Sequence, residues 1–249
     1  MAPRPQAARQ LLDPSIALCA LVAVAPVLVV AAAGIALSSP GPILYRAPRI
    51  ARDRRRIVPG GHADGCVPER RRQAGYHGRE FTLYKLRTMH VLTSGIASPI
   101  TARNDARVFS FGALLRAAKI DELPQLINVI RGEMAFVGPR PEAPEIVRSH
   151  YRADDLETLQ VLPGLTSPGS LYYYTHWEAV LRDVDVTQFY AEQVLPLKLR
   201  IDRVYISNAT RLYDLRVILR TIGVIAARLL GRQQFPDPPE MAKVRPAER

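Results

Sequence analysis

Residues 15–37 read SIALCALVAVAPVLVVAAAGIAL, and this uncharged run decides the class of the protein. It is about as long as a helix that crosses the hydrocarbon core of a bilayer. A secretory signal peptide fits poorly, because the run is longer than a typical apolar signal core and no secreted pattern follows it. Two interpretations remain: a helix that spans the membrane, or a re-entrant hairpin that enters one leaflet and returns to the same face.

Pro26 and the charges that flank the run favour the hairpin. Pro26 lies at the middle of the run, where a proline removes a backbone donor and kinks or breaks a helix. Positively charged residues stay on the cytoplasmic side of a membrane. Here they occur on both sides of the run, at Arg4, Arg9, Arg46, Arg49, Arg52, Arg54, Arg55 and Arg56. We therefore expect both ends on the cytoplasmic face, although a kinked spanning helix stays open as the alternative.

The composition of the whole chain fits a membrane-attached protein that handles phosphates. Of its 249 residues, 48% are hydrophobic and 23% are charged, which is too apolar for disorder and too polar for a multi-span membrane protein. The net charge of +11 points toward nucleic acid, anionic lipid or a phosphorylated substrate. Two cysteines, Cys19 and Cys66, cannot make a disulfide framework, which favours a chain facing the reducing cytoplasm.

Changes in composition divide the chain into four parts. Residues 1–50 form the membrane anchor, residues 53–77 form a basic loop insertion, residues 78–232 form one α/β domain, and residues 233–249 form a Pro-rich, disordered tail. The insertion carries three potential metal ligands whose spacing fits no zinc site: His62, Cys66 and His77.

Within the domain, the sequence pattern predicts a short strand and several helices. We expect a strand at 81–84, a short apolar segment at 135–137, and Gly132 as the residue that ends a helix. The expected helices cover residues 111–118, 123–131, 142–151, 153–161, 186–208 and 212–230. The last of these is basic and amphipathic, so it either packs on the domain or lies in the membrane interface.

The densest cluster of reactive side chains is KIDELPQLIN, at residues 119–128. Pro124 belongs in the first turn of a helix, which places Asp121 and Glu122 at the helix N-terminus. Acidic residues at that position often serve only to complement the helix dipole. A carboxylate held there can also attack phosphorus as a nucleophile, while a second carboxylate binds Mg²⁺ together with phosphate oxygens. The residues alone leave both interpretations open.

Basic residues near this cluster could serve phosphate chemistry. Arg116 precedes the two carboxylates, and Arg140 lies between two prolines that stiffen its loop. Lys85 and Arg87 follow the strand expected at 81–84. Any one of these residues is more often a solvated surface charge, so the hypothesis depends on their combination.

Other features indicate structure more than chemistry. The aromatic residues of 172–177 suit a sugar or nucleobase platform, but core packing is the favoured interpretation. The stretch PGLTSPGS at 163–170 lacks the Walker A lysine, so it is no P-loop, yet it fits a substrate loop rich in backbone N–H groups. Asp105 and Arg107 are expected to pair with each other.

In order and spacing, these motifs resemble those of the bacterial sugar transferase family, the monotopic polyprenyl-phosphate phosphoglycosyl transferases. The resemblance covers residues 11–50 and 79–230. The matching stretches are FTLYKLRTM (81–89), residues 105–107, LLR (114–116), IDELPQLINV (120–129), RGEM (131–134), VGPRP (137–141) and PGLT (163–166).

The resemblance implies an enzyme at the cytoplasmic face of the bacterial inner membrane. Such enzymes transfer a sugar-1-phosphate from a UDP-sugar to polyprenyl (undecaprenyl) phosphate and release UMP. They depend on Mg²⁺ and pass through a covalent phosphosugar–aspartate intermediate. The product opens a bacterial glycan pathway such as exopolysaccharide, capsule, O-antigen or glycoprotein glycan synthesis. The implied fold is helix-rich α/β, with a re-entrant N-terminal hairpin, a small catalytic domain and amphipathic interfacial helices.

The family's functional residues map onto named positions of this chain. Asp121 is the expected nucleophile and Glu122 its partner, and both are the expected Mg²⁺ ligands. The expected phosphate-binding residues are Lys85, Arg87, Arg116 and Arg140.

The chain also departs from the family pattern at three places. The family's re-entrant helix breaks at Ser-Pro, whereas this chain has Ala25-Pro26, so Pro26 alone carries over as the expected break. Residues 167–174 replace a segment in which many members carry an arginine, which leaves the sugar unassigned. Residues 53–77 have no counterpart in the compact members.

The expected partners are therefore the UDP-sugar, polyprenyl phosphate and membrane lipids. A membrane-tethered nucleic-acid-binding module would explain the charge, but the chain has no helix-turn-helix, RNA-binding or zinc signature, so nucleic acid is not an expected partner. A non-catalytic, single-pass polysaccharide-assembly protein is the other alternative, and it would place Arg4 in the periplasm. The oligomeric state stays open, with a homodimer among the options.

Overall fold

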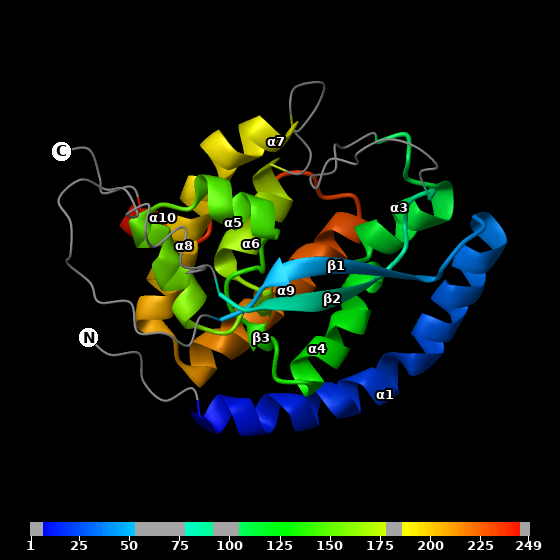
Figure 1. The fold of residues 1–249 in the computed structure, drawn as a ribbon, viewed down its shortest axis with the longest axis horizontal. Helices are drawn as coiled ribbons and strands as arrows, with labels where there is room; N and C mark the ends of the chain where they lie inside the picture. The colour runs from blue at the N-terminus through cyan, green and yellow to red at the C-terminus, as the bar shows by residue number, and fades with distance from the viewer. Residues whose placement is uncertain (1–6, 53–77, 92–104, 178–185, 245–249) are drawn as a thin grey trace.

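The computed structural model describes residues 7–52, 78–91, 105–177 and 186–244 as a helix-rich α/β structure (Figure 1). The helix α1 (Ala7–Ser38) runs along one edge of the molecule. Among the described residues, one helical stretch, Leu12–Ser38, is long and apolar enough to cross a membrane. The loop insertion predicted at 53–77 lies outside the described residues.

The helix α1 bends but does not break. It contains Pro14 and Pro26 and stays helical through both, and Figure 1 shows it as one curved helix. The structure thus does not show the two-armed hairpin that we expected around Pro26. A proline removes one hydrogen bond and forces a kink, but the turns on either side can remain helical.

One face of α1 packs on the rest of the protein along most of its length. Ala17 in the first half packs in an apolar cluster with Phe81 and Leu126. Ala31 and Ile35 in the second half pack in another cluster with Leu115. The large apolar side chains exposed along α1 are Leu12, Ile16, Leu18, Val22, Val27, Val29, Val30 and Leu37.

Among the described residues, the strands form two short sheets. Strand β1 (Leu44–Ile50) pairs antiparallel with β2 (Glu80–Leu86), so that Leu44 lies opposite Leu86. Strand β3 (Ala135–Val137) pairs parallel with β4 (Gly164–Thr166). The predicted strand at 81–84 is confirmed, whereas β1, β3 and β4 were not predicted as strands.

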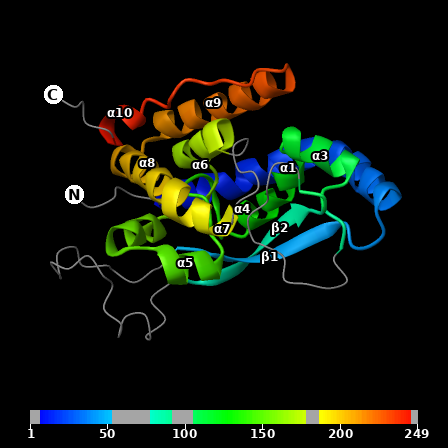
Figure 2. The same ribbon diagram turned by 90° about the horizontal axis from the view of Figure 1, so that it is seen from above.

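Most helices follow the predicted segments with shifted ends, whereas the helical segments at 168–177 and 241–244 were not predicted as helices. The helical elements after α1 are α3 (Ser110–Ala117), η1 (Ile120–Gln125), α4 (Leu126–Ile130), α5 (Pro144–His150), η2 (Ala153–Gln160), α6 (Pro168–Tyr172), η3 (Tyr173–Trp177), α7 (Val186–Phe189), η4 (Tyr190–Val194), α8 (Leu195–Asn208), α9 (Arg211–Leu229) and α10 (Met241–Val244). Gly132 adopts φ +69° directly after α4, which confirms its predicted role at the helix end. Figure 2 shows α9 on the side of the molecule opposite β1 and β2, with α4 and α6 between them.

The chain after Gln233 is ordered as far as Val244, so the predicted disordered tail is wrong for these residues. Glu240 is buried and accepts hydrogen bonds from Arg220 at 2.9 and 3.0 Å and from the Tyr213 hydroxyl at 2.5 Å. Met241 packs in an apolar cluster with Ile201. The composition of the segment is typical of disorder, but these long-range contacts stabilise it on α8 and α9.

Candidate active site

The two carboxylates predicted as the reactive pair lie in the first turn of η1. Asp121 is 1% exposed and Glu122 is 8% exposed. Lys119, just before them, has a left-handed backbone with φ 55° and ψ 19°. A left-handed residue other than glycine costs about 1 kcal/mol or more, and such strain is concentrated at functional sites. The prediction that the pair opens a helical segment is confirmed.

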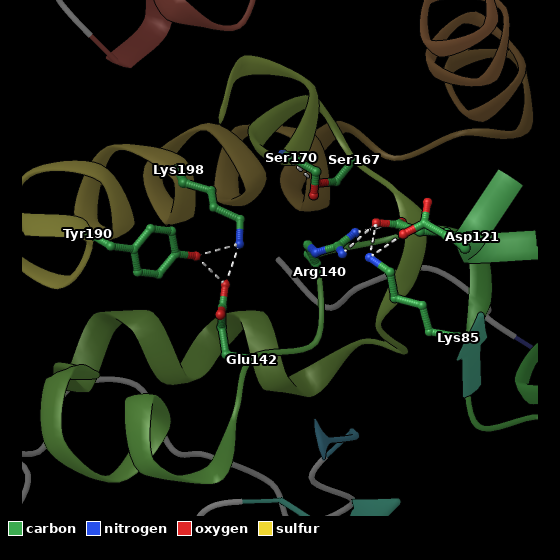
Figure 3. Close-up of polar contacts among 9 residues, drawn as sticks. Lys85, Asp121, Arg140, Glu142, Ser167, Ser170, Tyr190 and Lys198 are labelled. Carbon is green, nitrogen blue, oxygen red and sulfur yellow. Dashed lines mark hydrogen bonds and ion pairs between the residues drawn. The ribbon is translucent and has the colours of Figure 1, made fainter. Parts of the chain in front are cut away.

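Lys85 reaches both carboxylates from the neighbouring strand β2. Its Nζ lies 2.7 Å from Asp121 Oδ2 and 3.4 Å from Glu122 Oε1 (Figure 3). The structure therefore brings this predicted phosphate-binding residue into the site.

Asn128 fixes β2 beside the helical segment that carries the carboxylates. Its Nδ2 donates to the Thr82 carbonyl at 2.7 Å and to Glu133 Oε2 at 2.8 Å, and its Oδ1 accepts from the Tyr84 N–H at 3.2 Å. Pro48, which has no N–H to donate, lies opposite Thr82 in β1. The side chain of Asn128 thus bonds to the edge of β2 in the way that a neighbouring strand would.

Arg140 approaches Glu122 from the other side. Its Nη1 donates to Glu122 Oε2 at 2.9 Å and its Nη2 donates to Glu122 Oε1 at 2.8 Å. This two-pronged geometry is the strongest arrangement of a guanidinium on a carboxylate. The Arg140 side chain thus lies beside the carboxylate pair and is 32% exposed. Its phosphate-binding role stays a prediction.

The parallel pairing of β3 and β4 sets the position of the Arg140 loop. The Gly138 N–H donates to the Thr166 carbonyl at 3.0 Å, and the Gly164 N–H donates to the Pro139 carbonyl at 2.9 Å. A Cβ atom on Gly164 would lie only 2.1 Å from the Gly138 nitrogen. This close backbone approach explains why both positions are glycine.

The surrounding cations keep Glu122 ionised. Burial acts to raise the pKa of the Glu122 carboxyl, but the charges of Arg140, Lys85 and Lys119 outweigh it and hold that pKa well below its usual value. Glu122 therefore stays negative, with both of its oxygens bound to Arg140.

Asp121 differs from Glu122 because one of its oxygens is unused. Its Oδ1 is buried and accepts no hydrogen bond from the described residues. Within the described residues, no group of three or more His, Cys, Asp or Glu side chains gathers to hold a metal. Mg²⁺ needs no such group, since it commonly takes one or two carboxylates and completes its shell with phosphate oxygens and water. The chemistry of Asp121 and Glu122 therefore fits Mg²⁺ bound together with a phosphorylated substrate.

Arg87 does not lie at the site, contrary to the prediction. It is 5% exposed and donates to the Ser39 hydroxyl at 2.8 Å, the Ser39 carbonyl at 2.7 Å and the Pro42 carbonyl at 2.5 Å. The strand β2 ends at Leu86, so the alternation that would place Arg87 beside Lys85 stops there. Arg87 instead ties the end of β2 to the end of α1.

Arg116 lies on α3, and its guanidinium makes no hydrogen bond or ion pair with any residue that the structure describes. Its charge reaches Asp105, whose pKa is lowered mainly by the hydrogen bonds from Arg107 and to a smaller degree by Arg116. The predicted pairing of Asp105 with Arg107 is confirmed, with Arg107 Nη2 2.5 Å from Asp105 Oδ2. The phosphate-binding role of Arg116 stays a prediction.

The aromatic stretch at 172–177 contributes to the core, as predicted from the sequence. Tyr172 and Tyr174 are buried. The segment before it begins the helix α6, where the Ser170 N–H donates to Ser167 Oγ at 2.9 Å and the Gly169 N–H donates to Asp202 Oδ1 at 2.8 Å. These two N–H groups are thus already bonded within the protein, which weakens the prediction that the segment binds a substrate.

Sequence reasoning missed a second polar cluster beside Arg140. Lys198 donates to Glu142 Oε1 and, at 3.1 Å, to the Tyr190 hydroxyl, and that hydroxyl donates to Glu142 Oε1 at 2.7 Å (Figure 3). One signal was available: Lys198, one of only four lysines in the chain, lies within the apolar pattern LPLKLRI. Such a position predicts a buried charge with a partner.

Comparisons with known proteins show which family the sequence resembles. The family model described as bacterial sugar transferase matches residues 4–58 and 62–228. The chain is 36% identical over 203 residues to the UDP-glucose:undecaprenyl-phosphate glucose-1-phosphate transferase of Caulobacter vibrioides, covering 80% of this chain and 62% of that protein. It is 30% identical over 230 residues to the protein of the same name from Xanthomonas campestris pv. campestris, covering 91% of this chain and 39% of that protein.

A shorter relative matches over most of its length. The exopolysaccharide production protein ExoY of Sinorhizobium fredii is 30% identical over 228 residues, covering 86% of this chain and 83% of that protein. The family model matches most of the chain, including the stretches that hold Lys85, the carboxylate pair and Arg140. The chain belongs to the bacterial sugar transferase family.

Proposed function

We propose that the chain transfers a sugar-1-phosphate from a UDP-sugar to polyprenyl (undecaprenyl) phosphate and releases UMP, as the first membrane step of a bacterial glycan pathway. The observation that carries the proposal is Asp121: a buried carboxylate with one oxygen free, at the start of a helical segment, in contact with Lys85, which also contacts the Glu122 partner of Arg140. The names of the relatives, which specify undecaprenyl phosphate and UDP-glucose, support the same reaction for those proteins.

The chemistry follows from the free oxygen of Asp121. Asp121 Oδ1 attacks the phosphorus that carries the sugar, and the bond from that phosphorus to the bridging oxygen breaks, so that UMP leaves with the electron pair. An oxygen of polyprenyl phosphate then attacks the same phosphorus and releases the Asp121 carboxylate. The two steps use one site in turn, and the products are UMP and a polyprenyl diphosphate sugar.

Lys85 and Arg140 offset the negative charge of the donor. Both lie within hydrogen-bonding distance of the carboxylate pair, so the diphosphate would meet them when it approaches Asp121. Asp121 and Glu122 would hold Mg²⁺, which when bound neutralises the diphosphate and helps UMP depart. Between substrates, Glu122 would hold the Arg140 guanidinium beside Asp121, where the donor phosphorus would bind.

We also propose that α1 enters one leaflet and returns, so that the protein stays at the cytoplasmic face of the bacterial inner membrane. Buried residues of α1 extend from Ala17 to Ile35, so both of its halves contact the domain. A spanning helix would instead carry one half about 15 Å or more away from a domain on one side of the membrane. The exposed apolar side chains of α1 then face lipid, and the anchor at 1–50 and the catalytic domain at 78–232 form one packed unit.

Labelling of single cysteines tests this topology. In a chain whose native Cys19 and Cys66 are replaced by serine, Arg4→Cys and Ser38→Cys should react with a membrane-impermeant maleimide only after the inner membrane is permeabilised. Reaction of Arg4→Cys in intact spheroplasts would show that α1 spans the membrane and would overturn the proposal.

Two assays test the reaction. Purified protein with Mg²⁺ and a panel of UDP-sugars should release UMP over many turnovers only when polyprenyl phosphate is present, and at most one UMP per protein molecule without it; EDTA should stop the release. Without the acceptor, a donor labelled at the sugar phosphate should label the protein itself. Asp121→Asn should lose both signals, by about 10³-fold or more.

Asp154→Asn is the matched control. Asp154 is 77% exposed and lies in a weak ion pair with Arg203. It should retain the wild-type rate and labelling. Wild-type turnover by Asp121→Asn would refute the nucleophile assignment.

A further inference from the structure

The cluster formed by Glu142, Tyr190 and Lys198 is unusual because it is both charged and buried. The three residues come from the Arg140 loop, η4 and α8, and they are 8%, 4% and 1% exposed. Burying charges is costly, so such a cluster needs either complete pairing or a function. The proposed transfer uses none of these three side chains directly.

The cluster lies next to a residue that the transfer does use. Figure 3 shows Arg140 between the cluster and Asp121. Only Pro141 separates Arg140 from Glu142 in the chain. The charge of Glu122 is the main cause that raises the pKa of Arg140, and the charge of Glu142 adds to it. The Arg140 guanidinium thus interacts electrostatically with two carboxylates: Glu122 at the candidate active site and Glu142 in the buried cluster.

Contacts with Lys198 and Tyr190 hold the Glu142 carboxylate away from Arg140. Glu142 Oε1 accepts from Lys198 Nζ and from the Tyr190 hydroxyl. The backbone is fixed as well, since the Ile50 N–H donates to the Glu142 carbonyl at 3.1 Å. With Glu142 neutralised in this way, the Arg140 guanidinium donates through both of its Nη atoms to Glu122.

Resting on the proposed function, we propose that Lys198 is a positioning residue for the transfer. Together with Tyr190 it neutralises and holds Glu142, and so leaves the Arg140 guanidinium to Glu122 and to the diphosphate of the donor. Without the lysine charge, the Glu142 carboxylate competes with Glu122 and with the donor diphosphate for the Arg140 guanidinium, and it moves the guanidinium away from the reacting phosphorus. Lys198 itself touches no substrate.

The competition should depend on the protonation of Glu142. The groups that face Glu142 are Lys198 and Asp202 on α8, Tyr190 on η4, Arg49 on β1, Tyr151 after α5, and Arg140. Burial acts to raise the pKa of Glu142, and Lys198 is the largest opposing cause. Removing the lysine charge therefore raises that pKa, so protonation at lower pH should end the competition.

Lys198→Met is the central variant, and its kcat for UMP release should fall about 100-fold. Adding Glu142→Gln to Lys198→Met removes the competing charge and should recover at least about 10-fold of that loss. Lys243→Met, at an exposed lysine of α10, is the matched control and should equal the wild type. All rates are divided by the fraction of folded protein.

The pH profile separates positioning from a merely structural role. The ratio of the Lys198→Met rate to the wild-type rate should rise from pH 8.5 to pH 6, whereas the ratio for the double variant should stay flat. A destabilised site would give no such trend. Tyr190→Phe removes one donor to Glu142 without leaving an unpaired charge, and it should lower kcat about 5-fold with the same trend.

Several results would overturn the inference. They are a wild-type rate for Lys198→Met, a double variant no faster than the single one, or flat pH ratios for the single variants. If Lys198→Met does not fold, the activity of the double variant and the profile of Tyr190→Phe decide in its place. Absence of UMP release by the wild type is a different result, because it refutes the proposed function itself.

Discussion

Replacing Asn128 by alanine should destabilise the protein more than its small size suggests. The side chain is 0% exposed and makes three hydrogen bonds, to Thr82, Tyr84 and Glu133. At about 1 kcal/mol for each bond, the loss is about 3 kcal/mol. For a chain of this length that corresponds to roughly 10 °C in the melting temperature.

The assay is thermal unfolding in one detergent, followed by circular dichroism at 222 nm. Asn208→Ala is the matched control, because Asn208 is exposed and donates only to the Val204 carbonyl of its own helix, at 2.7 Å. The control should change the stability by about 0.5 kcal/mol or less. The activity of Asn128→Ala should also fall, since β2 carries Lys85 to Asp121.

The comparison of the two asparagines decides the matter. If Asn128→Ala melts at the same temperature as Asn208→Ala, then the three bonds contribute no net stability. That result would refute the argument that Asn128 bonds to β2 in place of a neighbouring strand.

Three further predictions concern the loop, the glycines and a buried acid. Arg140→Lys loses the paired hydrogen bonds at 2.8 and 2.9 Å and should lower kcat/KM about 100-fold, while Arg148→Lys, in a half-exposed pair, should change it less than about 2-fold. Gly164→Ala should lower both the melting temperature and the activity, because its Cβ would lie 2.1 Å from a backbone nitrogen. Gly223→Ala should instead stabilise α9 by about 1 kcal/mol, because its Cβ would meet no atom within 4 Å. Burial raises the pKa of Asp202 from 3.8 to about 6, so the folded state holds its proton more tightly than the unfolded state and stability falls as the pH rises through this window. Asp202→Asn should abolish that fall and be more stable at pH 8 by up to about 3 kcal/mol in denaturant titrations; equal curves for the variant and the wild type would contradict the pKa.

The parts of the site that could be predicted are those encoded by neighbouring residues. Pro124 places the two carboxylates at a helical start because proline lacks the N–H that an interior position needs. Gly132 ends the helix because its backbone is left-handed there. Asp105 and Arg107 pair over two residues. Each of these signals lies within a few positions of the feature that it predicts.

The parts that could not be predicted depend on partners far away in the sequence. Arg87 bonds to Ser39, and Lys198 bonds to Glu142, so neither role is encoded locally. The same is true of Glu240, whose bonds to Arg220 order a segment with the composition of a disordered tail. For such residues the sequence shows the charge but not its partner.

The shape of α1 was beyond prediction for a related reason. A proline within an apolar run permits either a kinked helix or a broken one. Which of the two has the lower free energy depends on how the turns on each side of the proline pack against the rest of the protein. In this protein both halves of α1 pack on the domain, at Ala17 and at Ile35. That packing is compatible with a continuous bent helix.

The packing of α1 has a consequence for how the enzyme can be modified. A fragment beginning at Leu44 would expose the apolar surfaces of two clusters to water, including Phe81, Leu83 and Leu115. Exposed surfaces of that kind promote aggregation. The catalytic domain therefore cannot be separated as a soluble fragment, nor grafted onto a foreign anchor, unless these surfaces are redesigned. In this protein the long apolar helix α1 is therefore part of the folded domain and cannot be treated as a separable anchor.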